Sequence, residues 1–112
     1  MQMTVVNLKE MKIFSPEKLK KNLLFQTDRL LCDLYCLEPG QSQKPHLHQE
    51  SDKVYIVLEG EGKFTVGGEE AKLGTPMAVL APAGMDHGVR NEGPDRLVLL
   101  VFMSPKPLSL TK

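Results

Sequence analysis

The chain has three histidines, and two of them are separated by a single residue. His46 and His48 lie in the segment KPHLHQESDKVYIVLEG, and His87 follows later in the chain. In a β-strand, side chains two residues apart point to the same side with their Cβ atoms about 7 Å apart, so two imidazoles can bind one ion. Imidazole nitrogen is a common ligand of divalent transition metals. His46 and His48 are therefore candidate metal ligands, although a solvated pair of histidines would have the same spacing.

Length and charge limit the classes of function. The 112 residues suffice for one domain with one core, and 14 basic residues balance 14 acidic ones without a block of like charge. This balance argues against binding to nucleic acid or to an anionic membrane surface. No apolar segment approaches the roughly 20 residues of a membrane span, and the N-terminus lacks a basic region followed by a long apolar run. We therefore expect a cytoplasmic protein without a nucleic-acid or membrane partner.

The two cysteines are expected to be packing residues. Cys32 and Cys36 lie in RLLCDLYCLEPG, a segment rich in strand-forming residues. Four positions along a strand place them on one face but about 13 Å apart, too far for a disulfide between them. Two small buried thiols in a reducing compartment account for the pair better than a metal site.

Strand-forming segments dominate the sequence after residue 29. They are bounded by glycine and proline turns, and Gly67-Gly68 is typical of a tight hairpin. Ser15 before Pro16 resembles a helix N-cap followed by a first-turn proline, so SPEKLKKNLL is expected to form a short helix or turn. We predict an all-β sandwich or barrel over residues 30–112, preceded by an N-terminal arm and short helix over residues 1–29.

The segment KVYIVLEG is apolar on both of its predicted faces. Alternation separates Lys53, Tyr55 and Val57 from an outer row that also contains apolar side chains, namely Val54, Ile56 and Leu58. Either a partner subunit or the N-terminal segment of the same chain would cover that outer row. A homodimer is the prediction that follows from the first alternative.

Two longer patterns resemble the motifs of the cupin superfamily. The segment from residue 40 to residue 60 is similar to the first motif, and PAGMDHGVRN is similar to the second, with Pro76 in place of its leading glycine. The matching positions are Gly40, His46, His48, Gly60, Pro82, Gly84, His87 and Asn91. The resemblance implies a double-stranded β-helix, or jelly roll, that often forms a homodimer. It also implies a divalent metal held by three histidines and a glutamate, with His46, His48 and His87 as the histidine ligands.

Lys53 stands where the resemblance would place the glutamate ligand. Glu50 and Asp52 could supply an oxygen only if the loop bent inward, and on a strand Asp52 points away from the side of Lys53. An ammonium about 5 Å from a dication costs roughly 7 kcal/mol at an effective dielectric near 20. The lysine is therefore neutral, turned toward the mouth or balanced by an anionic ligand, or else the metal is absent. Zinc, iron, manganese and nickel are the candidate metals, since three neutral imidazoles can bind without the carboxylate.

Three functions are compatible with these residues. The first is a metal-dependent enzyme, such as an oxygenase or isomerase, acting on a small and possibly anionic organic molecule, with Lys53 and Tyr55 as substrate-binding residues. The second is a non-catalytic binding or sensing protein with a degenerate metal site, and the third acts through dimerisation alone. Tyr55 and Met77 are expected to face the cavity or the core. Solvation in turns is the simplest role for Asp86 and Arg90.

Overall fold

The computed structural model describes residues 2–107 and contains nine β-strands within that range, all in antiparallel pairs. The strands are β1 (Lys20–Gln26), β2 (Leu31–Leu37), β3 (Ser42–His46), β4 (Asp52–Glu59), β5 (Glu61–Val66), β6 (Glu69–Gly74), β7 (Ala78–Ala81), β8 (His87–Arg90) and β9 (Leu97–Ser104). Residues 2–107 include no helix long and apolar enough to span a membrane.

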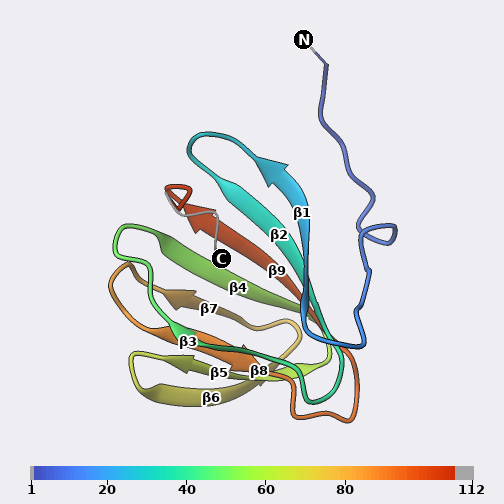
Figure 1. Cartoon of the computed structure of the whole chain (residues 1–112), viewed down its shortest axis with the longest axis vertical. Coiled ribbons are helices and arrows are strands. Elements are labelled where there is room, and N and C mark those ends of the chain that lie inside the picture. Colours follow the sequence, from blue (N-terminus) through green and yellow to red (C-terminus); the bar gives the residue numbers. More distant parts are fainter. Residues whose placement is uncertain (1, 108–112) are drawn as a thin grey trace.

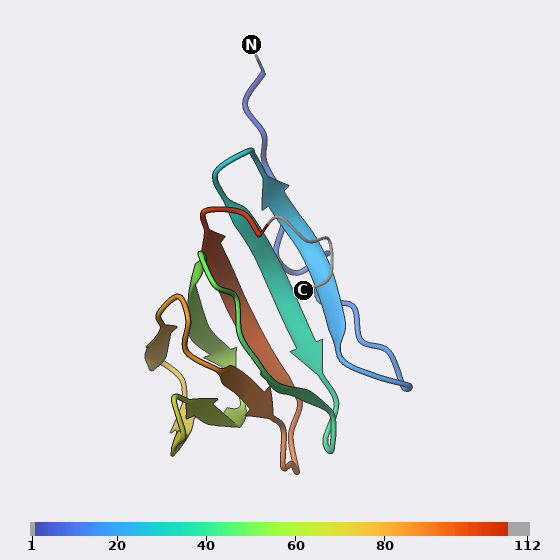
Figure 2. The ribbon, with the colours of Figure 1, turned by 60° about the vertical axis from the view of Figure 1, so that its left-hand side comes forward.

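The strands form two sheets that pack face to face (Figure 1 and Figure 2). The larger sheet has the order β1-β2-β9-β4-β7, and the smaller has the order β3-β8-β5-β6. Sequence neighbours such as β2 and β3 lie in different sheets, as a jelly roll requires. The all-β jelly-roll prediction is confirmed.

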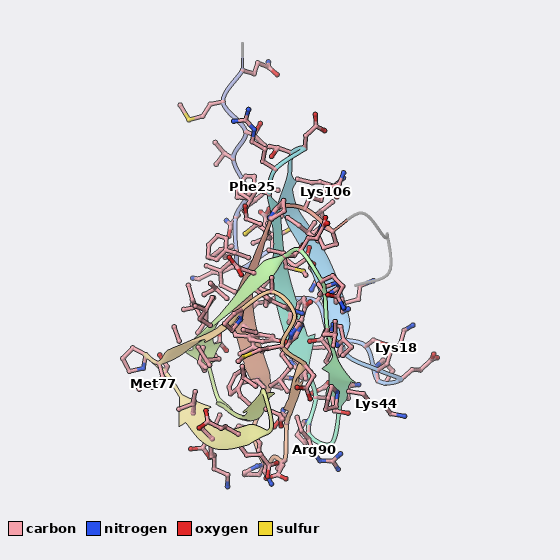
Figure 3. The ribbon with its side chains drawn as sticks, turned by 90° about the vertical axis from the view of Figure 1, so that its left-hand side faces the viewer. Lys18, Phe25, Lys44, Met77, Arg90 and Lys106 are labelled. Carbon is pink, nitrogen blue, oxygen red and sulfur yellow. The ribbon has the colours of Figure 1, made fainter. Side chains whose placement is uncertain are left out.

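The main hydrophobic core fills the space between the two sheets, where side chains from both layers meet (Figure 3). Alternation along the strands decides which residues enter it, since every second side chain points inward. The core consists of Tyr35, Leu37, Tyr55, Val57, Phe64, Val89, Leu97, Leu99 and Val101. Tyr55 is fully buried as expected, whereas Met77 precedes β7 and is 50 % exposed, so the interior position predicted for Met77 is wrong.

A second apolar cluster covers part of the outer face of the larger sheet. Its buried members are Leu24, Cys32, Leu34, Cys36 and Val98. Val6, Met11 and Phe14 of the N-terminal arm pack against it, together with Leu58 from the outer row of β4. The chain therefore covers part of that outer row with its own N-terminal segment. Both cysteines are buried free thiols on the same face of β2, as their spacing predicted.

No helix forms in the N-terminal part of the described chain. The Ser15 hydroxyl accepts a hydrogen bond from the Glu17 amide at 3.2 Å, and residues 16–18 form a bend that does not continue into a helix. The residues that follow become β1, which pairs with β2 through register pairs such as Lys21 with Tyr35. Pairing with an existing sheet edge and burial of Leu24 stabilise the strand over a short helix.

Two glycine turns have the backbone conformation that their sequences require. Gly67 and Gly68 both have positive φ, 58° and 85°, which is the signature of a type I′ hairpin between β5 and β6. Gly60, at the end of β4, has φ of 79° and lies against the backbone of Arg96. A side chain at residue 60 would meet the Arg96 carbonyl oxygen, so this position needs glycine for both its φ and its close approach.

Replacing Gly60 with alanine should destabilise the protein more than replacing Gly68. Both substitutions place a Cβ at positive φ, which costs about 1–2 kcal/mol. Only Gly60→Ala also forces a Cβ into a neighbouring backbone, whereas the space around residue 68 is open. We expect an additional loss of about 1–3 kcal/mol for Gly60→Ala. Urea unfolding of both variants measures the difference, and equal losses would show that the Arg96 backbone moves aside without cost.

Candidate metal site

The three histidines come together at one end of the space between the sheets, although they come from different places in the chain. His46 is the last residue of β3, His48 lies just beyond it, and His87 opens β8. Register pairs His46 with His87 across the β3–β8 ladder. Their ring centroids lie 4.6 Å apart, and the ring of His48 lies 5.1 Å from that of His46. One ligand nitrogen from each ring lies within 4.8 Å of the other two.

Hydrogen bonds to backbone carbonyls fix the tautomers of two of the rings. His46 Nδ1 lies 2.9 Å from the Lys44 carbonyl oxygen, and His87 Nδ1 lies 3.1 Å from that of Met85. A carbonyl oxygen only accepts, so each Nδ1 carries the proton and each Nε2 keeps its lone pair. This outer hydrogen bond is the arrangement that orients a metal-ligating histidine.

The Nε2 atoms of all three rings are buried and have no hydrogen-bond partner. A buried polar atom without a partner is costly, so three of them facing one point indicate a ligand that supplies the missing bonds. A divalent transition metal fits this donor set, since imidazole nitrogen suits zinc, iron and nickel. The residues present therefore fit a metal ion.

Electrostatics keep the three imidazoles neutral and available. Burial, and then the charge of Lys53, lowers the pKa of His87 to about 4. Burial is also the main cause that lowers the pKa of His46 and of His48, with Lys53 contributing to both. Neutral imidazole is the form that binds a metal, so the site is ready to bind at neutral pH.

Lys53 lies in the interior with its side chain completely buried. Its ammonium donates hydrogen bonds to the Tyr35 hydroxyl at 2.9 Å and to Gln43 Oε1 at 3.1 Å. It also lies 4.9 Å from the ring centroid of Tyr55, close enough for a cation–π contact. The sequence analysis allowed that Lys53 could turn toward the mouth of the barrel and away from the interior. Its complete burial shows that this alternative is wrong.

Neither neighbouring carboxylate joins the histidine group. Asp52 is exposed on the face of β4 opposite to Lys53, as alternation predicted, and Glu50 lines a pocket beside His48 without belonging to the histidine group. Instead, Asp52 Oδ1 accepts a hydrogen bond of 2.8 Å from the backbone amide of Ala83. The next amide, that of Gly84, donates to the carbonyl of His48 at 2.9 Å. These two bonds hold the turn before His87 against the segment that carries His48.

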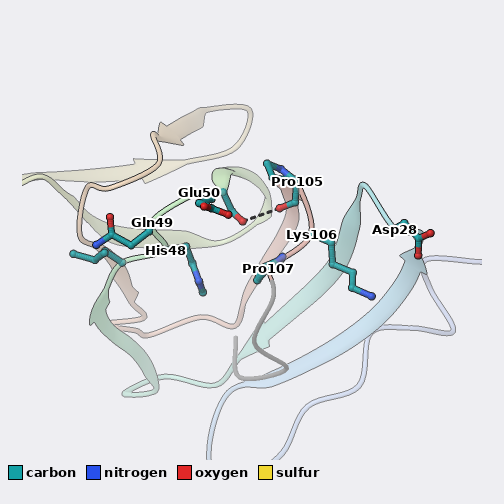
Figure 4. A pocket seen from close by; sticks show the side chains of 9 residues that line it. Asp28, His48, Gln49, Glu50, Pro105, Lys106 and Pro107 are labelled. Atoms are coloured by element: carbon teal, nitrogen blue, oxygen red, sulfur yellow. Dashed lines mark hydrogen bonds between the residues drawn. The ribbon is translucent and has the colours of Figure 1, made fainter.

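A pocket of about 490 Å³ opens beside His48, and in Figure 4 the His48 side chain extends into it, with Asp28 and Lys106 across the space. The loop between β3 and β4 forms one wall, and the Ser51 hydroxyl ties it to the Pro105 carbonyl at 2.7 Å. Of the three histidines, His48 is the one that lines this pocket. Asp86 and Arg90 are exposed, and neither belongs to the histidine group.

Gln43 and Tyr35 are the polar residues that the sequence analysis missed. Gln43 Oε1 also accepts a hydrogen bond of 2.8 Å from the Tyr55 hydroxyl, and Gln43 Nε2 donates to Tyr35 at 3.3 Å. Alternation along β2 could have placed Tyr35 on the face that points into the core, because Leu37, two positions later, lies on the same face. No sequence signal links a glutamine on β3 with residues on β2 and β4, because that contact forms only when the sheets pack.

Asp52 should influence metal affinity although it does not contact the site. Asp52→Ala removes the acceptor for the Ala83 amide, and we expect zinc affinity to fall about tenfold, the lower range for loss of an outer hydrogen-bond partner. Asp52→Asn keeps an acceptor oxygen and should retain most of the affinity. Asp86→Ala, which removes an exposed carboxylate next to His87, is the matched control for charge. Calorimetric titration checks this, and equal losses for Asp52→Ala and Asp86→Ala would contradict the role of the hydrogen bond.

The metal-free protein should lose stability as the pH falls from about 6.5 to about 4. In the unfolded chain, histidines take up protons near pH 6.5, whereas His87 in the folded chain does so only near pH 4. The unfolded state therefore binds more protons within this window, which favours unfolding. His87→Gln should flatten the dependence. Urea unfolding with a chelator present measures it, and an unchanged slope in His87→Gln would show that another group dominates.

Comparisons with known proteins identify the family to which this sequence is similar. The cupin domain family matches residues 33–103. The curated protein TcmJ of the tetracenomycin polyketide synthase, from Streptomyces glaucescens, is 35% identical over 74 residues, which is 63% of this chain and 50% of that protein. An uncharacterized protein from Aquifex aeolicus is 38% identical over 64 residues, covering 57% of this chain and 52% of its own length. The chain thus spans about half the length of these curated relatives.

Solved structures extend the similarity. TT1209 from Thermus thermophilus is 51% identical, with a TM-score of 0.90, over 94% of this chain and all of that one. A predicted oxalate decarboxylase from Thermotoga maritima shares the fold at 22% identity, with a TM-score of 0.74, over 79% of this chain and 81% of that one. The family match covers well over half of the chain and includes all three histidines. The chain therefore belongs to the cupin family.

Proposed function

We propose that this small cupin binds a divalent transition metal through Nε2 of His46, His48 and His87, and that it holds a small organic molecule beside the metal. The observation that carries this proposal is the set of three buried, unpartnered Nε2 atoms. Protonation of Nδ1 in two of the rings leaves the lone pair on Nε2, the atom that would bind the metal. A metal bound here would act as a Lewis acid toward an oxygen of the bound molecule.

Zinc, iron and nickel suit the donor set better than manganese does. Three neutral imidazoles form a borderline-soft site, whereas manganese prefers carboxylate and water oxygens. The carboxylate that would favour manganese is replaced by Lys53. Three protein ligands also leave a coordination position open, as in metal sites that bind a substrate or water.

The interior charge favours an anionic molecule. Lys53 is buried near the histidines, where its charge contributes to lowering the pKa of all three. A metal would add two further positive charges, and an anion beside it would offset both. Lys53 and Tyr55 contribute by different routes. Lys53 supplies charge, and Tyr55 acts through Gln43, to which its hydroxyl donates.

A non-catalytic binding or sensing role is the second candidate, and Lys53 is the observation that favours it. Loss of the carboxylate ligand removes one group that a metal-dependent oxygenase or isomerase could use to tune its metal. The elemental content of tag-free protein purified without chelators, read together with native mass spectrometry, distinguishes the two. A stoichiometric metal supports the metal-dependent function, and a bound organic molecule without metal supports binding alone.

Substitutions at Lys53 and His87 test the metal site. We expect His87→Ala to lower zinc affinity by more than about 100-fold, beyond the range for loss of an outer hydrogen-bond partner. Lys53→Met removes a positive charge and should raise affinity, and Lys53→Glu should raise it further by adding an oxygen ligand and should extend binding to iron and manganese. Calorimetric titration of each metal-free variant gives these values.

Circular dichroism of each variant is the control for folding, since Lys53 and His87 are buried. If His87→Ala left zinc affinity unchanged, the three-histidine site would be wrong. If His87→Ala abolished binding while both Lys53 variants matched the wild type, the charge of Lys53 would not reach the metal. The preference for an anion through Lys53 would then fail, and the metal site would stand.

A further inference from the structure

Part of the outer face of the larger sheet is only partly covered by residues 2–107. Alternation turns every second side chain of β4, β7 and β9 toward this face, and register aligns these side chains in neighbouring rows. One row contains Phe102, Val54 and Leu80, and the next contains Leu100, Ile56 and Ala78. We call these residues the outer patch.

The outer patch is most exposed where it lies farthest from the N-terminal arm. Its rows continue onto β2 as Cys32 and Leu34, which are buried in the cluster that the arm covers. On β9 and β4 the patch residues are partly buried, and Leu80 on β7 is 54% exposed. Along β4 this face is apolar between Asp52 at one end and Glu59 at the other. An apolar centre with a polar rim is typical of a protein–protein interface.

The arm itself has a free apolar side. Residues 2–6 lie outside any strand or turn, and this segment extends beyond the end of the sheet (Figure 1 and Figure 2). Val6 packs against the cluster on the outer face of its own sheet. Side chains alternate along an extended chain, so Met3 and Val5 point away from the side of Val6. They are 87% and 74% exposed, which leaves two large apolar side chains in water.

The area of the outer patch determines how much surface must be added to form a stable interface. Three neighbouring strands over about six residues measure roughly 14 by 20 Å, which gives about 300 Å². A standard interface buries about 800 Å² on each partner, so the patch alone is too small to hold a stable complex. Residues 2–6 of the arm, about 17 Å long when extended, carry the apolar surface that would add to it.

We propose that the outer patch binds a second copy of this chain in a symmetric dimer, in which the arm of each protomer packs between the two outer faces and contacts the outer patch of its partner. Val6 stays on its own sheet, and Met3 and Val5 face the patch of the partner. Each chain carries both an apolar sheet face and an apolar arm, so a twofold axis uses each of these surfaces twice. Removal of these side chains from water stabilises the dimer.

The proposed interface is separate from the candidate metal site. Lys53 and Tyr55 alternate with Val54 and Ile56 along β4, so they point to the opposite side of the sheet. The dimer therefore forms with or without a metal. Failure of the dimer would leave the proposed metal site unaffected, and failure of the metal site would leave the dimer unaffected.

Sedimentation equilibrium of the full chain at micromolar concentration tests the dimer. We expect the wild type to have twice the mass of one chain. Leu80→Lys places a charge in the outer patch, and Val5→Lys places one on the free side of the arm. Each should weaken dimerisation by at least about 30-fold, the size of an interface hot spot. Leu23→Lys is the matched control, because Leu23 is also exposed, at 46%, but pairs with Asp33 on the opposite face of the sheet.

All three substituted residues are exposed in the single chain, so the variants should fold, and circular dichroism checks this. A monomeric wild type would overturn the proposal and leave the outer patch to another protein or to the arm of the same chain. A dimer that persists in Leu80→Lys would use a different face, which also overturns it. If Leu80→Lys dissociated the dimer and Val5→Lys did not, the contact between arm and partner would be wrong. Dissociation by both variants, with Leu23→Lys still dimeric, supports the proposal.

Discussion

The buried ammonium of Lys53 is the constraint around which the interior is arranged. A charge without exposure to water is tolerated only when polar groups replace the water. Tyr35 from β2 and Gln43 from β3 supply two acceptors, and Gln43 also accepts from Tyr55 of β4. Because β2 and β4 belong to one sheet and β3 to the other, this network joins the two layers as well as solvating the charge.

The same charge affects the histidines. Burial is the main cause that lowers the pKa of the three imidazoles, and the positive charge of Lys53 lowers it further by opposing a second positive charge nearby. Lys53 has two opposite effects on metal binding. Its charge helps to keep the imidazoles neutral, which is the form that binds a metal, but the same charge repels the metal ion and lowers its affinity. An anion is the component that reconciles these two effects, since it is attracted to both charges.

Three hydrogen bonds that do not involve the histidine side chains help to hold the backbone around the site. The Asp52 carboxylate and the His48 carbonyl each bind an amide of the turn from residue 82 to residue 85, and that turn leads directly to His87. The loop after His48 is fixed in turn by Ser51 on the Pro105 carbonyl. These hydrogen bonds keep the segments that carry the three histidines together, although Lys53 stands at the position of the glutamate ligand in the cupin motif.

The homodimer and the cytoplasmic location stay predictions.

The sequence by itself determined the strand-rich character, the family and the three histidines, because these depend on local patterns. Alternation and glycine turns follow from backbone geometry, and the spacing of His46, His48 and His87 matches a motif that can be recognised without coordinates. Alternation also predicted that Lys53 and Asp52 point to opposite sides. The motif register was enough to show that a carboxylate ligand is missing.

Tertiary structure decided the residues that act across strands. The capping signal at Ser15 and Pro16 indicated a helix or turn, but the following residues gained more by pairing with β2, which turned Lys21 inward. Met77 proved exposed because β7 is an edge strand whose start lies outside the core. Tyr35 became a partner of Lys53 when β2 and β4 joined one sheet, and Gln43 became a partner only when the two sheets met. Contacts between residues far apart in sequence depend on how whole strands and sheets pack, and local sequence patterns do not predict that packing.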